Sequence, residues 1–195
     1  EAPENVHAER ERANLLVSLD QLAVDFPNCD WVMLVVSWFG DDLRCGACEI
    51  RPGVEIAEKH NVPIAWRAGG VGRGAAHLIS THDGGPAYGG TPSDRSVLQA
   101  NAELKQRGYK VGLYPFLMMD IPDGNALPDP YGGAAQARYP WRGRVSVHPA
   151  AGEPETVDQS EAAGDQVAAF FGDAAISDFG VGGDGEPTYA GADAW

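Results

Sequence analysis

The chain has 195 residues, of which 44% are hydrophobic and 22% charged, and a formal net charge of −14 from 28 acidic and 14 basic residues. This composition predicts a folded globular protein and excludes a disordered chain. The acidic balance argues against nucleic acid as a partner, because binding it requires a basic surface. No apolar run approaches the roughly 20 residues of a membrane span, so we expect no membrane insertion.

The first 42 residues predict one helix and one strand. Apolar residues spaced three and four apart predict an amphipathic helix over residues 9–26, and Pro27 ends it. The segment WVMLVVSWF at 31–39 is β-branched and aromatic almost throughout. A run of this kind predicts a strand buried on both faces, as in parallel sheets. Gly40-Asp41-Asp42 ends that strand.

Residues 43–90 predict irregular loops and short strands. Short strands are expected at 62–66 and 76–79, and the sequence HDGGP at 82–86 predicts a turn. The glycine-rich segment at 69–74 follows no strong strand, so we interpret it as a flexible loop, with a phosphate-binding loop as the alternative.

The next unit is a helix followed at once by a strand. Thr91 is typical of a helix N-cap and Gly108 of the residue after a helix end, which predicts a helix over about 93–107. The segment KVGLYPFLMM at 110–119 predicts a second strand, parallel to the first and buried on both faces. Asp120 stands at its C-terminal end.

The last third of the chain predicts a long loop and one further helix. Residues 122–138 are rich in Gly and Pro, and 139–147 could hold a short strand. Thr156, followed by Gln159 three residues later, predicts the cap of a helix over about 157–171.

The cysteines and histidines give no clear metal site. The five histidines show no HxH or HExxH spacing, so we predict no metal site built on histidines. We also predict no cofactor, and we name no metal-binding residue. Cys45 and Cys48 form a CxxC pair, and Cys29 is the only other cysteine. Reduced thiols, one disulfide or a three-cysteine metal cluster all remain open.

Three segments of the chain resemble one known family, in the same order. In chain order they are WFGDDLRCGAC at 38–48, the block YGGTPSDRSVLQANAELKQRGYKVGLYPFLMMDIPDGNALPDPYGG at 88–133, and YPWRGRVSV at 139–147. Together they are similar to the TIM-barrel-like domain of the large tail-tip protein of gene transfer agents and related tailed phages. The resemblance covers roughly residues 4–195. It implies a barrel related in fold to glycoside hydrolases, located at a tail tip near the host envelope.

We therefore predict an α/β fold, namely the N-terminal portion of a partial (β/α) TIM-barrel-like domain with long irregular loops. A complete barrel takes about 250 residues, so we expect residues 1–195 to be a single-domain fragment. Residues 1–90 hold the first helix, the first strand and an irregular region. Residues 91–195 hold the βα units of the barrel.

Acidic residues follow both predicted strands. TIM-barrel enzymes carry their sites at the C-terminal ends of the strands, and glycosidases use a pair of carboxyl groups. Asp41 and Asp120 are therefore the candidate catalytic residues. The alternatives are a solvated turn pair for Asp41 and Asp42, and a loop cap for Asp120.

Trp141, Arg142 and Tyr114 are the candidate substrate-binding residues. Aromatic faces suit sugar rings, and the guanidinium fork of arginine suits carboxylates. We expect the long loop to bring Trp141 and Arg142 back to Asp120 and Asp41 within one concave surface. The alternative is that Trp141 packs in the core while Arg142 or Arg144 pairs with an aspartate at a strand end. In that case Arg142 would neutralise Asp120 and lock the loop. A site requires an open pocket, whereas a lock requires burial.

Two functions follow from the resemblance. The first is a structural virion component of a phage-like tail tip or baseplate, acting in host contact or tail assembly. Its partners would be other tail proteins, and a host surface glycan is a further candidate. Several copies would surround the tail axis of a virion produced in the bacterial cytoplasm. The alternative is a glycoside hydrolase acting on cell-wall or surface polysaccharide during entry, so the sequence leaves enzymatic activity open.

Overall fold

The computed structural model describes residues 12–61, 64–138, 144–183 and 187–191. Within these ranges the helices are α1 (Asn14–Asp25), α2 (Asp94–Gln106) and α3 (Glu161–Phe171). The long strands are β1 (Trp31–Gly40) and β9 (Lys110–Met119). The short elements are β2 (Ile50–Arg51), β3 (Gly53–Val54), β4 (Arg67–Ala68), β5 (Val71–Gly72), β6 (His77–Leu78), β7 (Thr81–His82), β8 (Gly85–Pro86), β10 (Phe179–Val181), β11 (Pro187–Tyr189), and the 3₁₀ turns η1 (Cys45–Ala47), η2 (Arg73–Ala75) and η3 (Ile176–Asp178).

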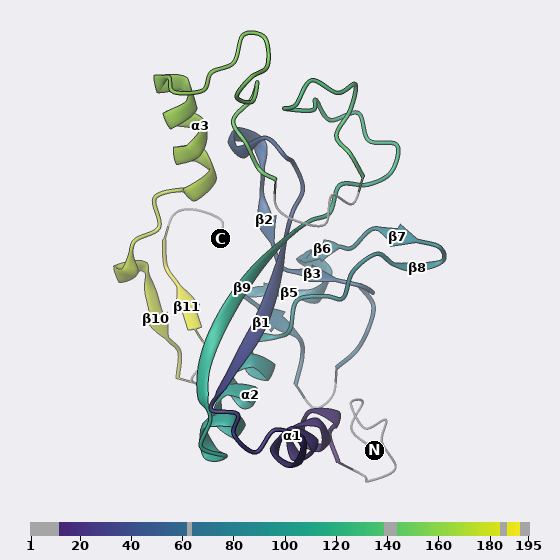
Figure 1. Ribbon diagram of the computed structural model, residues 1–195, viewed down its shortest axis with the longest axis vertical. Helices are drawn as coiled ribbons and strands as arrows, with labels where there is room; N and C mark the ends of the chain where they lie inside the picture. The colour runs from purple at the N-terminus through teal and green to yellow at the C-terminus, as the bar shows by residue number, and fades with distance from the viewer. Residues whose placement is uncertain (1–11, 62–63, 139–143, 184–186, 192–195) are drawn as a thin grey trace.

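The centre of the molecule is a long ribbon in which β1 and β9 run side by side (Figure 1). The two strands are parallel and in register from Trp31 opposite Lys110 to Gly40 opposite Met119. This confirms both predicted strands and their parallel direction. The antiparallel β2 extends the sheet at the C-terminal end of β1, in the order β2-β1-β9. The other short strands form two-stranded sheets, so the partial barrel stays a prediction.

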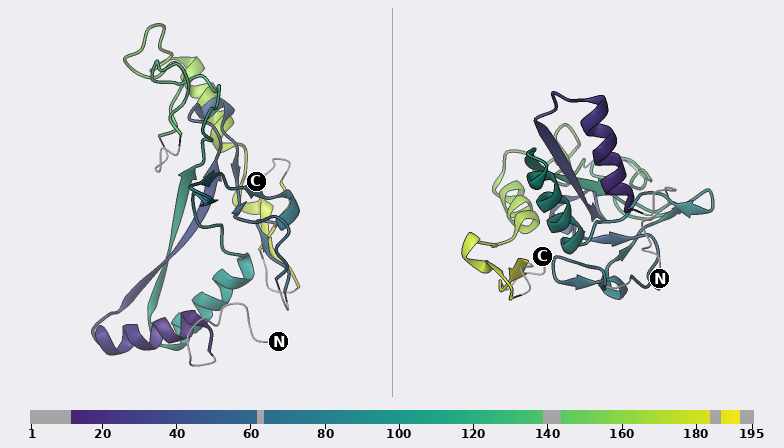
Figure 2. Two further views of the ribbon diagram at one scale, coloured as in Figure 1. Left: turned by 90° about the vertical axis from the view of Figure 1, so that its right-hand side faces the viewer. Right: turned by 90° about the horizontal axis from the view of Figure 1, so that it is seen from below.

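The other elements are gathered at the two ends of the ribbon and on one side of it. Helices α1 and α2 lie at the end where β1 and β9 begin, and α3 lies at the opposite end (Figure 1). The short sheets lie on one side of the ribbon, and among the described residues no element covers the other side of its N-terminal half (Figure 2, left). No helix in the described ranges is long and apolar enough to cross a membrane.

The ribbon differs from prediction in its burial. Both strands were expected to be buried on both faces, but Trp31, Met33 and Val35 of β1 and Tyr114 of β9 are 60%, 52%, 58% and 50% exposed. These four residues, which we call the open face, lie on one side because alternate residues of a strand share a face and Val35 pairs directly with Tyr114. Leu113 of β9, on the other face, is also 61% exposed. An apolar run carries no alternation, so the sequence could not show which parts of the two faces lack a cover.

Proline at position 115 is explained by the edge position of β9. The Lys110 N–H donates to Asp30 O at the start of β9, and the Asp120 N–H donates to Gly40 O at its end. Donors that point toward β1 therefore recur at every second residue, at even positions. The nitrogen of Pro115 points away from β1, where no N–H is needed in an edge strand.

Helix α2 begins at a different cap from the predicted one. Ser93 is the N-cap, and its hydroxyl accepts the Ser96 N–H. Thr91 is buried instead, where its hydroxyl donates to Ser37 O at 2.7 Å and accepts the Gly53 N–H at 2.8 Å. Thr91 therefore connects β1 to β3 rather than starting a helix.

Helix α3 also starts later than predicted. Its N-cap is Ser160, whose hydroxyl accepts the Ala163 N–H. The predicted cap, Thr156, instead accepts the Asp158 N–H and donates to Pro149 O. A local turn of this kind competes with helix formation, because threonine can bond to nearby backbone in either conformation.

The region between β2 and α2 is irregular, as expected. The predicted strand at 76–79 is present as β6, and the predicted turn at 82–86 joins β7 to β8 with Asp83 and Gly84 at positive φ. Residues 64–66 form no strand, and the remainder of the predicted strand at 62–66 lies outside the described residues.

Two clusters of buried residues pack the C-terminal half of the ribbon. Leu43, Met119 and Ile121 form one cluster, next to Leu127 and Val145. The other consists of Val54, Trp66 and Ala68. The first cluster places the ends of β1 and β9 in a well-packed environment, which fixes the acidic residues that follow both strands.

Candidate functional site

Asp120 follows the last residue of β9 and its side chain is fully buried, with 0% exposure. Its Oδ2 accepts hydrogen bonds from His77 Nε2 at 2.6 Å and from the Ser80 N–H at 2.9 Å. Its Oδ1 is buried with no hydrogen-bond partner among the described residues. The contacts attach β6 and Ser80, which follows it, to the end of β9, and His77 and Asp120 are 43 residues apart in sequence.

Burial alone would raise the pKa of Asp120, but the hydrogen bonds from His77 and Ser80 outweigh it, so the pKa lies below its ordinary value. An ionised carboxylate is an acceptor only, so His77 Nε2 carries the proton in this pair. The His77 side chain is 24% exposed and its ring stacks at 6.0 Å on the ring of Phe39. Asp120 and Phe39 together fix the orientation of the imidazole.

Asp42 holds the long loop after β9 against the end of β1. Its carboxylate binds the Arg44 guanidinium through Nη2 at 2.6 Å and Nε at 3.0 Å. Gln136 Nε2 donates to the same carboxylate at 2.7 Å, while Gln136 Oε1 accepts the Leu43 N–H at 2.9 Å. Burial would raise the pKa of Asp42, but the bonds from Arg44 and Gln136 lower it. Asp42 is therefore a structural anchor for residue 136.

Asp41 precedes Asp42 in the chain, but its pKa is raised rather than lowered. Burial raises the pKa of Asp41, and the neighbouring charge of Asp42 acts in the same direction. The charge of His77 acts on Asp41 in the opposite direction. Asp41 Oδ1 accepts the Glu49 N–H at 2.9 Å. Two carboxyl groups at the ends of neighbouring parallel strands thus have pKa values shifted in opposite directions.

The three cysteines are free thiols. Cys45 is buried in η1, and Cys48 lies close enough to Asp41 and Asp42 for their charges to act on it. Burial raises the pKa of the Cys48 thiol to about 11. No group of three His, Cys, Asp or Glu residues in the described part of the chain is arranged to hold a metal ion.

Of the other predicted site residues, only Tyr114 lies within the described part of the chain, and it is distant from this cluster. Tyr114 lies on the open face, six residues before Asp120, which is about 20 Å along a strand. Trp141 and Arg142 lie outside the described residues, so their predicted approach to Asp120 stays a prediction. Asp120 itself is buried and contacts His77 and Ser80, so neither the predicted site nor the predicted Arg142 lock is decided by the described residues.

His77 and Gln136 are the residues that sequence reasoning missed. Each is joined to its aspartate by a long-range contact, from 77 to 120 and from 136 to 42. No local motif marks either residue, because β6 has only two residues and Gln136 lies in a loop. The position of Asp120 at a strand end indicated that it would have a partner, but not which one.

The site therefore holds one buried carboxylate, one partly exposed imidazole and one carboxyl group with a raised pKa. The imidazole of His77 is held to Asp120 through Nε2, and the structure gives its Nδ1 no hydrogen bond among the described residues. A comparison of the chain with models of known protein families finds no match, and neither does a comparison with curated proteins.

Proposed function

We propose that the chain is a structural component of a phage-like tail tip or baseplate, which binds neighbouring tail proteins through the open face of the β1–β9 ribbon. The proposal starts from the resemblance of the three sequence segments to gene transfer agent tail proteins. The open face is the single structural observation that carries it, because it is a surface suited to assembly.

Parallel strands are normally covered on both faces, because helices or further strands pack on each side of the sheet. Here Trp31, Met33, Val35 and Tyr114 are all at least half exposed on one side of a parallel pair. A contiguous apolar patch of this kind marks an interaction surface in soluble proteins. The face also lacks acidic residues, in a chain of net charge −14.

The setting of this function follows the resemblance. The chain would be made in the bacterial cytoplasm and become part of the virion at the tail tip. Several copies would surround the tail axis, in contact with other tail proteins, and a host surface glycan remains a candidate ligand. The buried contacts of Asp120 and Asp42 suit a rigid module whose loops are held in place.

The test is made in cells that naturally produce the particles. Val35→Glu and Tyr114→Glu together place charges on the open face, and Ile176→Glu is the matched control because Ile176 is also exposed but lies in η3. We expect particles from the double variant to lack the protein or the tail tip, and control particles to be normal. Native particles that lack the protein by mass spectrometry would refute the proposal.

A second candidate is favoured by one observation. Asp41 and Asp120 have pKa values shifted in opposite directions, and an acid paired with a carboxylate is the general arrangement of glycoside hydrolases. Because the Asp120 carboxylate is fully buried, it would act on a glycan only through His77. The test is release of reducing ends from peptidoglycan and capsule. Release by the wild-type chain that a folded Asp41→Asn variant loses would establish the hydrolase and displace the first proposal.

A further inference from the structure

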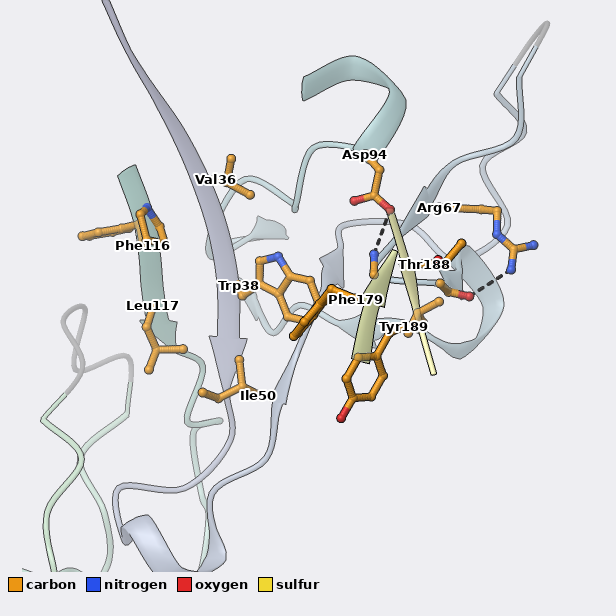
Figure 3. A pocket seen from close by; sticks show the side chains of 14 residues that line it. Val36, Trp38, Ile50, Arg67, Asp94, Phe116, Leu117, Phe179, Thr188 and Tyr189 are labelled. Atoms are coloured by element: carbon orange, nitrogen blue, oxygen red, sulfur yellow. Dashed lines mark hydrogen bonds between the residues drawn. The ribbon is translucent and has the colours of Figure 1, made fainter. Parts of the chain in front are cut away.

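A cavity of about 1060 Å³ lies on the opposite side of the ribbon from the open face. Val36 and Trp38 of β1 line one wall, and Phe179 and Tyr189 of the β10–β11 hairpin line the wall opposite (Figure 3). The alternation of residues along β1 separates this side from Val35. Cavities that hold small organic molecules measure roughly 300–1000 Å³, so this one is large enough for a ligand.

Aromatic rings stand on both walls of this cavity. The indole of Trp38 points from β1 toward Phe179 (Figure 3). The rings of Phe179 and Tyr189 contact each other at 5.0 Å between centroids, with a tilt of 45°. The outer edge of the indole lies against the β4–β5 turn, where a Cβ added to Gly69 would come within 2.6 Å of Trp38. This turn therefore fixes the position of the indole.

The charged side chains that line the cavity are Arg67 and Asp94, which carry opposite charges. Asp94 Oδ2 accepts the Gly69 N–H at 3.0 Å, and Arg67 Nη2 donates to Gly70 O at 2.9 Å (Figure 3). Both side chains are thus directed onto the backbone of the same turn. The lining has no net charge, and its remaining surface is mostly aliphatic and aromatic.

We propose that this cavity is a binding site for a flat, uncharged ring compound, which lies between the indole of Trp38 and the rings of Phe179 and Tyr189. Offset stacking on aromatic faces supplies the attraction, and the balanced charges of Arg67 and Asp94 disfavour both anions and cations. The site is independent of tail assembly, because it lies on the other face of the ribbon and on the C-terminal hairpin.

The test uses the uncharged flat dye Nile red, titrated into the full chain and followed by its fluorescence. We expect saturable binding to the wild-type chain. Phe179→Ala should raise the dissociation constant about tenfold, because it removes one stacking wall. Val181→Ala is the matched control, because Val181 is an exposed residue of the same strand that does not line the cavity. It should bind like the wild type. Circular dichroism verifies that each variant is folded.

Two further experiments determine where the dye binds and whether the site prefers uncharged or anionic compounds. Dye bound in the cavity should quench the fluorescence of Trp38, and Trp38→Phe should remove that quenching. Val35→Ser changes the open face and should leave binding unchanged. Loss of binding in Val35→Ser, or equal binding by Phe179→Ala and Val181→Ala, would overturn the proposal. The anionic dye anilinonaphthalene sulfonate should bind less tightly than Nile red. If it binds more tightly, and Arg67→Gln abolishes that binding, the site selects anions and the proposal of an uncharged ligand is wrong.

Discussion

At the residue scale, Asp120 joins two parts of the chain that lie far apart in sequence. Its side chain is buried at the end of β9, and both of its hydrogen bonds come from the segment 77–80. A buried charge is tolerated only when donors compensate for the water it loses. The pairing of Asp120 with His77 and Ser80 is therefore a condition for placing a carboxylate at this position.

Replacing Asp120 with Asn should lower the free energy of unfolding by about 1–3 kcal/mol at pH 7, because a neutral amide oxygen accepts the bonds from His77 and Ser80 more weakly than a carboxylate, and the amide NH2 would take the buried Oδ1 position, which has no partner among the described residues. The pKa of Asp120 is lower in the folded chain, so the unfolded chain takes up the proton first as the pH falls. This stabilisation is complete above about pH 4 and is lost as the pH falls through the folded pKa.

Urea unfolding of the wild type and of Asp120→Asn between pH 3 and pH 7 measures this effect. The difference between the two proteins should narrow below about pH 4. Asp123→Asn is the control, because Asp123 is exposed where it pairs with Arg138, and it should change stability by less than about 0.5 kcal/mol. A difference that stays constant down to pH 3 would argue against an ionised Asp120.

The Cys48 thiol should react slowly with iodoacetamide in the folded chain. The thiolate is the reactive form, and with a pKa of about 11 it makes up about a thousandth of the thiol at pH 8. Peptide mapping by mass spectrometry should show the modification of Cys48 rising about tenfold per pH unit from 8 to 10. In urea Cys48 should react readily. Rapid reaction in the folded chain at pH 8, or blockage in urea until a reductant is added, would contradict a buried free thiol.

At the element scale, the β4–β5 turn positions Trp38. Gly69 and Gly70 both have positive φ, but only Gly69 faces the indole, since nothing lies within 4 Å of a Cβ added at Gly70. Gly70→Ala should therefore lower the free energy of unfolding by only about 1 kcal/mol, because alanine disfavours a positive φ. Gly69→Ala should cost about 1–3 kcal/mol more, because the side chain overlaps Trp38. Urea unfolding measures both, and equal losses in the two variants would show that Trp38 does not rest on this turn.

The long elements were predictable because their signals are local. The apolar runs of β1 and β9 and the glycine at 108, observed at φ +89, mark their elements without reference to the rest of the chain. Thr91 failed as a cap because a tertiary contact with Ser37 and Gly53 uses its hydroxyl, while Ser93 is available two residues later. Local propensity gives way to tertiary contacts at positions of this kind.

The candidate site was predictable only in part, for the same reason. The position of Asp41 and Asp120 after parallel strands follows from the sequence, and both lie there. The partners of Asp120 depend on how the irregular region after β2 folds back onto β9. The strands of that region have only two residues each, which is too short for an alternation of apolar and polar residues to predict them. The burial of Asp120 and the exposure of Tyr114 depend on which surfaces are covered, and this is a property of the whole fold.

At the scale of the whole molecule, the open face and the net charge act against each other. The apolar side chains of the ribbon favour association, whereas a charge of −14 keeps copies of the chain apart. Salt weakens only the repulsion, because the Debye length falls from about 10 Å at 0.1 M to about 3 Å at 1 M. We therefore expect the purified chain to be monomeric at low salt and to self-associate as the salt concentration rises.

Analytical ultracentrifugation at 20 mM and at 1 M sodium chloride measures this balance. The variant with Val35→Glu and Tyr114→Glu should stay monomeric at both concentrations, because charges on the open face disfavour its burial. Ile176→Glu adds charge at an exposed site away from the ribbon and should associate nearly as the wild type does. Association that persists in the open-face variant would place the contact elsewhere on the molecule. Monomeric wild-type chain at 1 M salt would show that the open face is too small to bind without a dedicated partner.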